Sequence, residues 1–125
     1  MTSYLVVFLG GGIGAALRHG VNRLAVAMFG HGFPAGTLIV NIGGSLAMGL
    51  LIGALAAVPG GTSHHLRLFL ATGVLGGFTT FSAFSLDALT LWERGQAGAA
   101  VAYVAASVIL SLLAVAAGFF LSRAF

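Results

Sequence analysis

The sequence contains no cysteine, and only 2 of its 125 residues are acidic. Without cysteine, the chain can form neither a disulfide framework nor a thiolate-bound zinc or iron–sulfur site. Two carboxylates are also too few for most acid–base or carboxylate–metal chemistry, which argues against an enzyme. Charged residues make up 6% of the chain, compared with about 25% in a typical soluble domain. Because so few charges cannot cover a water-facing surface, the lipid bilayer is the expected solvent.

The net charge of +3 comes from 5 basic residues, all of them arginine. A basic chain can indicate nucleic-acid binding, but these arginines stand singly among apolar runs and form no basic patch. The sequence therefore predicts no nucleic-acid partner.

Hydrophobic residues make up 59% of the chain and are concentrated in four long runs. A helix of about 20 apolar residues crosses the hydrocarbon core of a bilayer. The runs predict transmembrane helices at residues 4–28, 35–58, 66–92 and 97–121. Only short connectors remain, so residues 1–125 are expected to form one all-α, four-helix transmembrane domain.

The third run concentrates glycines and hydroxyl side chains in mid-span, from Gly73 to Ser85. This composition predicts a helix that is broken near residues 76–80. Non-helical backbone is tolerated at membrane depth only where it is buried or lines a cavity, and its freed carbonyls can bind ions. Such oxygen ligands would suit an alkali cation.

Two ladders of polar side chains, with four-residue spacing, run along the second and fourth predicted helices. They are Thr37, Asn41 and Ser45, and Tyr103, Ser107 and Ser111. Residues four apart share a helix face, and polar groups at membrane depth are functional candidates. Facing ladders could form an ion-solvating track. The alternatives are an interhelical hydrogen bond for the asparagine and hydroxyl bonds to carbonyls of the same helix.

Phenylalanines recur every three residues in the third run, at Phe78, Phe81 and Phe84. Such a stripe is usually packing against the core or lipid. The alternative is that the ring edges, which carry the positive end of the aromatic quadrupole, contact a small anion. Glycines at helical spacing, such as Gly10 with Gly14 and Gly73 with Gly77, predict close helix packing.

The arginines show almost no bias between the two membrane sides. An even number of spans puts Arg67 and Arg123 on one side and Arg18, Arg23 and Arg94 on the other. The positive-inside rule needs a bias to fix orientation, so the chain is expected to insert both ways up. Four helices are also too few to enclose a pathway. Both observations predict a dual-topology, antiparallel homodimer; the alternative is a heterodimer with a paralogous subunit of opposite orientation.

Three segments spread over the whole chain resemble the Fluc/CrcB fluoride channels of bacteria. They are GGIGAALR at residues 11–18, GTLIVNIG at residues 36–43 and GGFTTFSAFS at residues 76–85. The resemblance implies an antiparallel homodimer in the bacterial cytoplasmic (inner) membrane, with two fluoride pathways around a central structural sodium ion. Its implied function is passive export of fluoride from the cytoplasm, which reduces fluoride toxicity.

The resemblance also implies roles for individual residues of this chain. The fluoride pathway would comprise the aromatic pair Phe81 and Phe84, the amide donor Asn41, and the hydroxyls of Thr80, Ser82, Tyr103, Ser107 and Ser111. The sodium ligands would be the backbone carbonyls of Gly76 and Thr79 from both subunits, and Arg18 would lie near the aqueous vestibule. Ala83 stands where the family more often has threonine, and Phe78 receives no role.

Two alternatives belong to other classes of protein. A small multidrug exporter also uses four helices and an antiparallel dimer, but its proton exchange resembles chemistry built on a glutamate in the first helix. This chain has no acidic residue before Asp87. A non-transporting membrane scaffold would explain the glycine faces but not Asn41, the ladders or the broken third helix.

Overall fold

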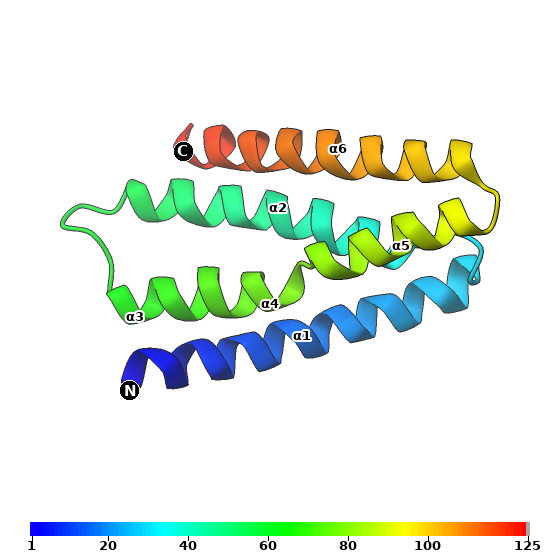
Figure 1. Ribbon diagram of the computed structural model, residues 1–125. Helices are drawn as coiled ribbons and strands as arrows, with labels where there is room; N and C mark the ends of the chain where they lie inside the picture. Colours follow the sequence, from blue (N-terminus) through cyan, green and yellow to red (C-terminus); the bar gives the residue numbers. More distant parts are fainter. Residues whose placement is uncertain (125) are drawn as a thin grey trace.

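The computed structural model describes residues 1–124, and this part of the chain consists of helices joined by short connectors (Figure 1). The bounds are α1 (Thr2–Phe29), α2 (Ala35–Ala56), α3 (His64–Arg67), the π-helix η1 (Leu68–Leu75), α4 (Gly76–Phe78), α5 (Phe81–Glu93) and α6 (Ala97–Arg123). The segments α3, η1, α4 and α5 together make one span, His64–Glu93. Four segments are therefore long and apolar enough to cross a membrane, as predicted.

Successive spans run in opposite directions. Figure 1 shows both termini at one end of the bundle, together with the α2–α3 connector. The α1–α2 and α5–α6 connectors lie at the other end. The last turn of the third span closes at Gly95, whose positive φ of 79° is open to glycine but rarely adopted by other residues. The short connector predicted between residues 92 and 97 is therefore present.

The third span is interrupted where the sequence concentrates glycine and threonine. Helix α4 ends at Phe78, and Thr79 (φ −85°, ψ 161°) and Thr80 (φ −154°, ψ 124°) are extended before α5 begins. The first half of the span packs against α1, whereas α5 packs against α6. The predicted break is thus a two-residue extended link that redirects one continuous span from one neighbour to another.

Glycines set the closest helix approaches within the bundle. A Cβ atom on Gly10 of α1 would lie 2.6 Å from the Phe69 carbonyl oxygen of η1. A Cβ atom on Gly49 of α2 would lie 2.8 Å from the Phe119 nitrogen of α6. Real side chains do not fit at these distances, so the backbones touch directly. The predicted small-residue faces therefore hold α1 to the third span and α2 to α6.

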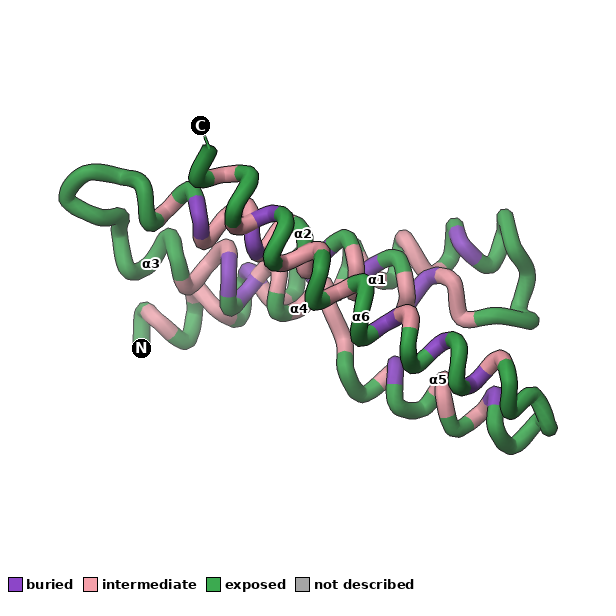
Figure 2. The backbone as a smooth tube through the Cα atoms, turned by 90° about the horizontal axis from the view of Figure 1, so that it is seen from above, coloured by how far each residue is buried: buried purple, intermediate pink, exposed green. Residues whose placement is uncertain are grey.

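Little of the protomer is buried. The core is one small cluster, formed by Phe84, Leu91, Ala100 and Tyr103. Figure 2 shows the buried positions as short separate stretches, with residues of intermediate burial and exposed residues along the rest of each helix. Large apolar side chains cover much of the remaining surface. This surface suits lipid or a second protein surface rather than water.

Arg18 lies well inside α1, and its side chain contacts the third span at the break. The sequence alone predicts Arg18 among the loops at one end of the bundle, which the structure contradicts. Removing it from the count of arginines leaves Arg67 and Arg123 at one end, against Arg23 and Arg94 at the other. The balance of positive charge is therefore even.

Candidate functional site

The side chain of Asn41, in α2, is both a donor and an acceptor of hydrogen bonds to the extended link of the third span. Its Nδ2 donates to the Thr80 carbonyl oxygen (2.9 Å), and its Oδ1 accepts from the Thr80 backbone nitrogen (2.8 Å). The interhelical hydrogen bond considered in the sequence analysis is therefore present. An asparagine amide carries two N–H groups, so one donor remains beyond this pair.

Arg18 binds the same region from the opposite helix. Its Nε donates to the Gly77 carbonyl oxygen at 3.1 Å. The carbonyls at the end of a helix lack intrahelical partners and form the negative end of its dipole, so a guanidinium is favourable there. Arg18 and Asn41 thus reach the break from α1 and α2.

Backbone carbonyls around the break fall into two groups. Those of Leu75, Gly77 and Thr80 accept hydrogen bonds, the first from both the nitrogen and the hydroxyl of Thr79. Within residues 1–124, no donor reaches the carbonyls of Gly76, Phe78 and Thr79. The two carbonyls expected from the sequence as cation ligands are therefore among the three that remain free.

A cavity of about 270 Å³ lies beside the break, between α2, α5 and α6. It is lined by Asn41, Ser45, Thr79, Thr80, Phe81, Phe84, Ser107, Val108, Ser111 and Leu112. The cavity therefore brings together both members of the expected aromatic pair, the amide and two hydroxyls of the fourth helix. Its chemistry combines hydrogen-bond donors with aromatic rings.

The two aromatic residues differ sharply in exposure. The ring centroids of Phe81 and Phe84 are 5.4 Å apart, with 57° between the ring planes. Phe84 is 7% exposed, whereas Phe81 is 76% exposed. Phe84 is thus fixed in the core, while Phe81 projects away from its own protomer.

Ser107 and Ser111 line the same cavity from α6. Their Oγ atoms are buried, and neither has a hydrogen-bond partner within the described chain. The alternative that these hydroxyls bond to carbonyls of their own helix is therefore wrong. Because buried polar groups are nearly always paired with protein, water or an ion, these two hydroxyls leave hydrogen-bonding capacity free at the cavity.

Tyr103, the third member of this ladder, is fully buried and does not line the cavity. Its hydroxyl donates to Oδ2 of Asp87 at 3.1 Å. Its ring centroid is 5.4 Å from that of Phe84 and 5.6 Å from that of Phe33. Tyr103 therefore stands between the first cavity and the end of the bundle that holds the α1–α2 connector.

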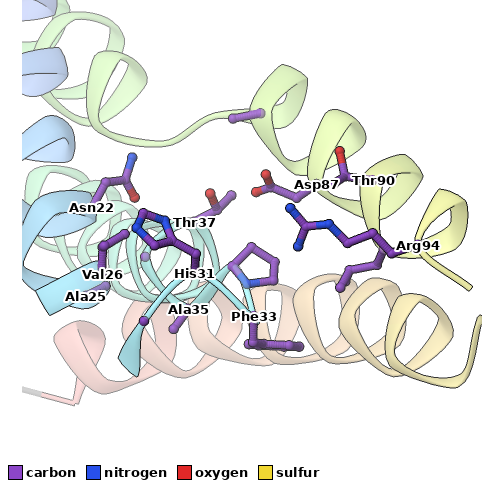
Figure 3. Close-up of a pocket in the computed structure, with 15 residues that line it drawn as sticks. Asn22, Ala25, Val26, His31, Phe33, Ala35, Thr37, Asp87, Thr90 and Arg94 are labelled. Atoms are coloured by element: carbon purple, nitrogen blue, oxygen red, sulfur yellow. The ribbon is translucent and has the colours of Figure 1, made fainter. Parts of the chain in front are cut away.

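A second cavity, of about 300 Å³, opens at that end. Figure 3 shows Asp87 of α5 and Arg94, which follows α5 directly, projecting toward it, opposite Asn22 and Thr37. Asp87 was not predicted as a residue of the site. An acidic residue inside a span was the available signal, because such residues are functional candidates by default.

The remaining hydroxyls of the break have local roles. Oγ1 of Thr80 accepts from the Ala83 nitrogen at 3.1 Å and thereby caps the start of α5. Ser82 is exposed and does not line the cavity; its Oγ lies 3.4 Å from Oγ1 of Thr80. Thr80 thus lines the cavity and caps a helix, whereas Ser82 points elsewhere in the protomer.

Comparison with known proteins identifies the family. The profile of "CrcB-like protein, Camphor Resistance (CrcB)" matches residues 5–119. Three similar proteins are named "Fluoride-specific ion channel FluC". The one from Methylobacterium nodulans is 58% identical over 125 residues, 100% of this chain and 99% of the relative. The one from Paracoccus denitrificans is 59% identical over 121 residues, 97% and 94% of the two chains. The one from Rhodopseudomonas palustris is 54% identical over 122 residues, 98% of each. With a match this long and this close, the chain belongs to the Fluc/CrcB fluoride ion channel family.

Proposed function

We propose that this protein is a passive, fluoride-specific ion channel. The observation that carries the proposal is the pair of buried, unpartnered hydroxyls of Ser107 and Ser111 beside Phe81 and Phe84. Fluoride is small and strongly hydrated, so its passage requires donors that replace its water. Aromatic ring edges add only weak attraction, which lets the ion leave again. The names of the relatives support the same ion.

The pathway would run from the first cavity past Tyr103 into the second. The ring of Tyr103 contacts Phe84, and its hydroxyl reaches Asp87 at the second cavity. A phenol carries one hydrogen, so the hydroxyl can donate to fluoride only after releasing Asp87. Thr80 contributes from the cavity wall, and Ser82 would contribute only across a subunit contact. Asn41 has a second N–H available for the ion.

The working unit would be a dual-topology, antiparallel homodimer with two pathways. The even distribution of arginines between the two ends supports insertion in both orientations. The projecting Phe81 supports a pathway completed by a second copy, because its ring is available to a partner's cavity. The large exposed apolar surface supports the same arrangement in a bilayer.

A structural sodium ion would lie at the dimer centre, held by the carbonyls of Gly76 and Thr79 from both copies. Both carbonyls lack a donor within residues 1–124, which fits this role. Neutral oxygens are the ligand type that a hard cation prefers. When bound, the ion supplies a fixed positive charge that raises the local concentration of anions.

The channel would lie in the bacterial cytoplasmic (inner) membrane and release fluoride that accumulates in the cytoplasm. Arg18 would draw anions toward the vestibule with the guanidinium N–H groups that Gly77 does not use. Neither alternative function is favoured. A multidrug exporter would need a carboxylate in its first helix, and this chain has no acidic residue in its first two helices; a scaffold has no need of unpartnered hydroxyls.

The experiment that tests the proposal is ion efflux from proteoliposomes, with fluoride and chloride followed in parallel by ion-selective electrodes. Wild-type protein should release fluoride rapidly and chloride hardly at all. Phe81→Ala and Asn41→Ala should reduce the fluoride flux. Folded dimers that pass no fluoride would refute the channel, and equal passage of chloride would refute its specificity.

A further inference from the structure

Some backbone carbonyls of the break accept hydrogen bonds from the protein, whereas others are free. Arg18 is the donor to one of the occupied carbonyls. Gly77 lies between Gly76 and Phe78, whose carbonyls are free, yet its own carbonyl is held by the guanidinium Nε. We propose that Arg18 is a positioning residue for the central cation site, acting through its Nε–H on the Gly77 carbonyl. This inference rests on the sodium ion of the proposed function.

A helix that ends inside a membrane presents several unsatisfied carbonyls in the same direction. Without side-chain donors, all of them would compete for one cation, and the ligand set would not be unique. Here two side chains from different helices each bind one carbonyl. Arg18 of α1 binds that of Gly77, and Asn41 of α2 binds that of Thr80.

Each of these two hydrogen bonds holds the peptide plane that directly follows one of the expected ligands. The carbonyl of Gly76 directly precedes that of Gly77, and the carbonyl of Thr79 directly precedes that of Thr80. Adjacent peptide planes are joined through a single residue, so when one plane is held, only the φ and ψ of that residue remain to orient the neighbouring carbonyl. The expected ligands, Gly76 and Thr79, are thus each adjacent to an anchored carbonyl.

The N–H group, rather than the charge, is sufficient for this role. No carboxylate within residues 1–124 forms an ion pair with Arg18, and the bond to Gly77 comes from Nε. A glutamine side chain has its Nε2 at the same position along the chain as the Nε of arginine. Arg18→Gln therefore keeps the donor and removes the charge, whereas Arg18→Met keeps a similar stem and removes both.

The test is the sodium dependence of thermal unfolding of the purified full-length protein. Sodium chloride would be titrated against N-methylglucamine chloride at constant ionic strength. Arg18→Gln should keep the half-maximal sodium concentration within about twofold of wild type, whereas Arg18→Met should raise it about tenfold or more, as for loss of an outer-shell partner of a metal site. Arg23→Met, at an exposed arginine of the same helix, is the matched control and should behave as wild type.

Each other result has a distinct meaning. If Arg18→Met binds sodium as wild type does, or if Arg18→Gln is impaired as much as Arg18→Met, the inference is wrong. If sodium does not stabilise the wild type, the sodium site fails and this inference with it, while fluoride efflux from the same preparation still tests the channel. If Arg18→Met does not fold, an experimental structure of the wild type in sodium decides. The inference is supported if the Gly77 carbonyl accepts a hydrogen bond from Arg18 in that structure, and it is overturned if that carbonyl binds the ion.

Discussion

Ser107 and Ser111 present an unusual combination at the scale of single residues, because their hydroxyls are buried but have no hydrogen-bond partner. A hydrogen bond that is absent from the folded protein cannot be lost on mutation. We therefore expect Ser107→Ala and Ser111→Ala to leave the free energy of unfolding unchanged or to raise it, by up to about 1–3 kcal/mol, because a buried unpaired hydroxyl is costly. Fluoride flux should nevertheless fall about tenfold or more, since a hydrogen bond to a charged group contributes about 1.5–3 kcal/mol.

Ser85→Ala is the matched control for this pair. Ser85 is exposed on the neighbouring span, and its hydroxyl donates to the Phe81 carbonyl of its own helix at 2.9 Å. Its removal should leave flux unchanged in the same proteoliposome assay. Undiminished flux in Ser107→Ala and Ser111→Ala would show that the ion does not use these hydroxyls.

Asn41 is the opposite case, because both sides of its amide are already used for structure. Asn41→Ala leaves the Thr80 carbonyl and nitrogen without partners. Hydrogen bonds between helices in membranes contribute about 1–2 kcal/mol at most, so a thermal unfolding measurement should show a loss of that order. Fluoride flux should fall together with stability. Wild-type stability in Asn41→Ala would contradict the anchoring role of this amide.

At the scale of helices, the four spans follow from hydrophobic runs alone, and the break follows from glycine and threonine in mid-span. The sequence did not indicate that η1, which packs closely against α1 at Gly10, is a π-helix, because hydrophobic periodicity does not separate a π-helix from an α-helix over so short a segment. The pairing of Tyr103 with Asp87 was also missed. Residues 16 apart are brought together by the packing of α5 on α6, and neither residue type alone specifies that packing.

The packing of α2 on α6 yields a prediction about glycine. At Gly49 a Cβ atom would lie 2.8 Å from the Phe119 nitrogen, and backbone cannot move aside as a flexible side chain can. Gly49→Ala should therefore destabilise the protein by about 1–3 kcal/mol in thermal unfolding. Gly98→Ala is the control, since nothing lies within 4 Å of its Cβ position, and it should be neutral or stabilising by up to about 1 kcal/mol. Equal effects at both sites would contradict the close contact.

At the scale of the whole molecule, the protomer is unfinished in two respects. Phe81, one of the two phenylalanines at the cavity, projects outward, and the free carbonyls of the break are too few to surround a cation. A second copy in the inverted orientation would provide both a surface for the projecting ring and further carbonyls for the cation. Such a partner exists only if the chain inserts in both directions, so the charge balance of the connectors becomes a functional property.

This balance can be shifted deliberately. Gly32→Arg with Gln96→Arg adds two charges to connectors at one end, and Pro59→Arg with Thr62→Arg adds two at the other. Each double variant should insert in one orientation, because positively charged loops remain in the cytoplasm. Either variant alone should lose most of its fluoride efflux, for want of an inverted partner. Co-expression of the two should restore it.

Orientation itself can be read because the chain has no cysteine. A single cysteine introduced by Ala57→Cys, in the exposed residues after α2, should be labelled by a membrane-impermeant maleimide in about half of the wild-type copies in intact cells. The two charge variants should move this fraction toward opposite extremes. Labelling of all wild-type copies, or of none, would mean one fixed orientation. Full efflux from a single charge variant would mean that the working channel needs no inverted copy.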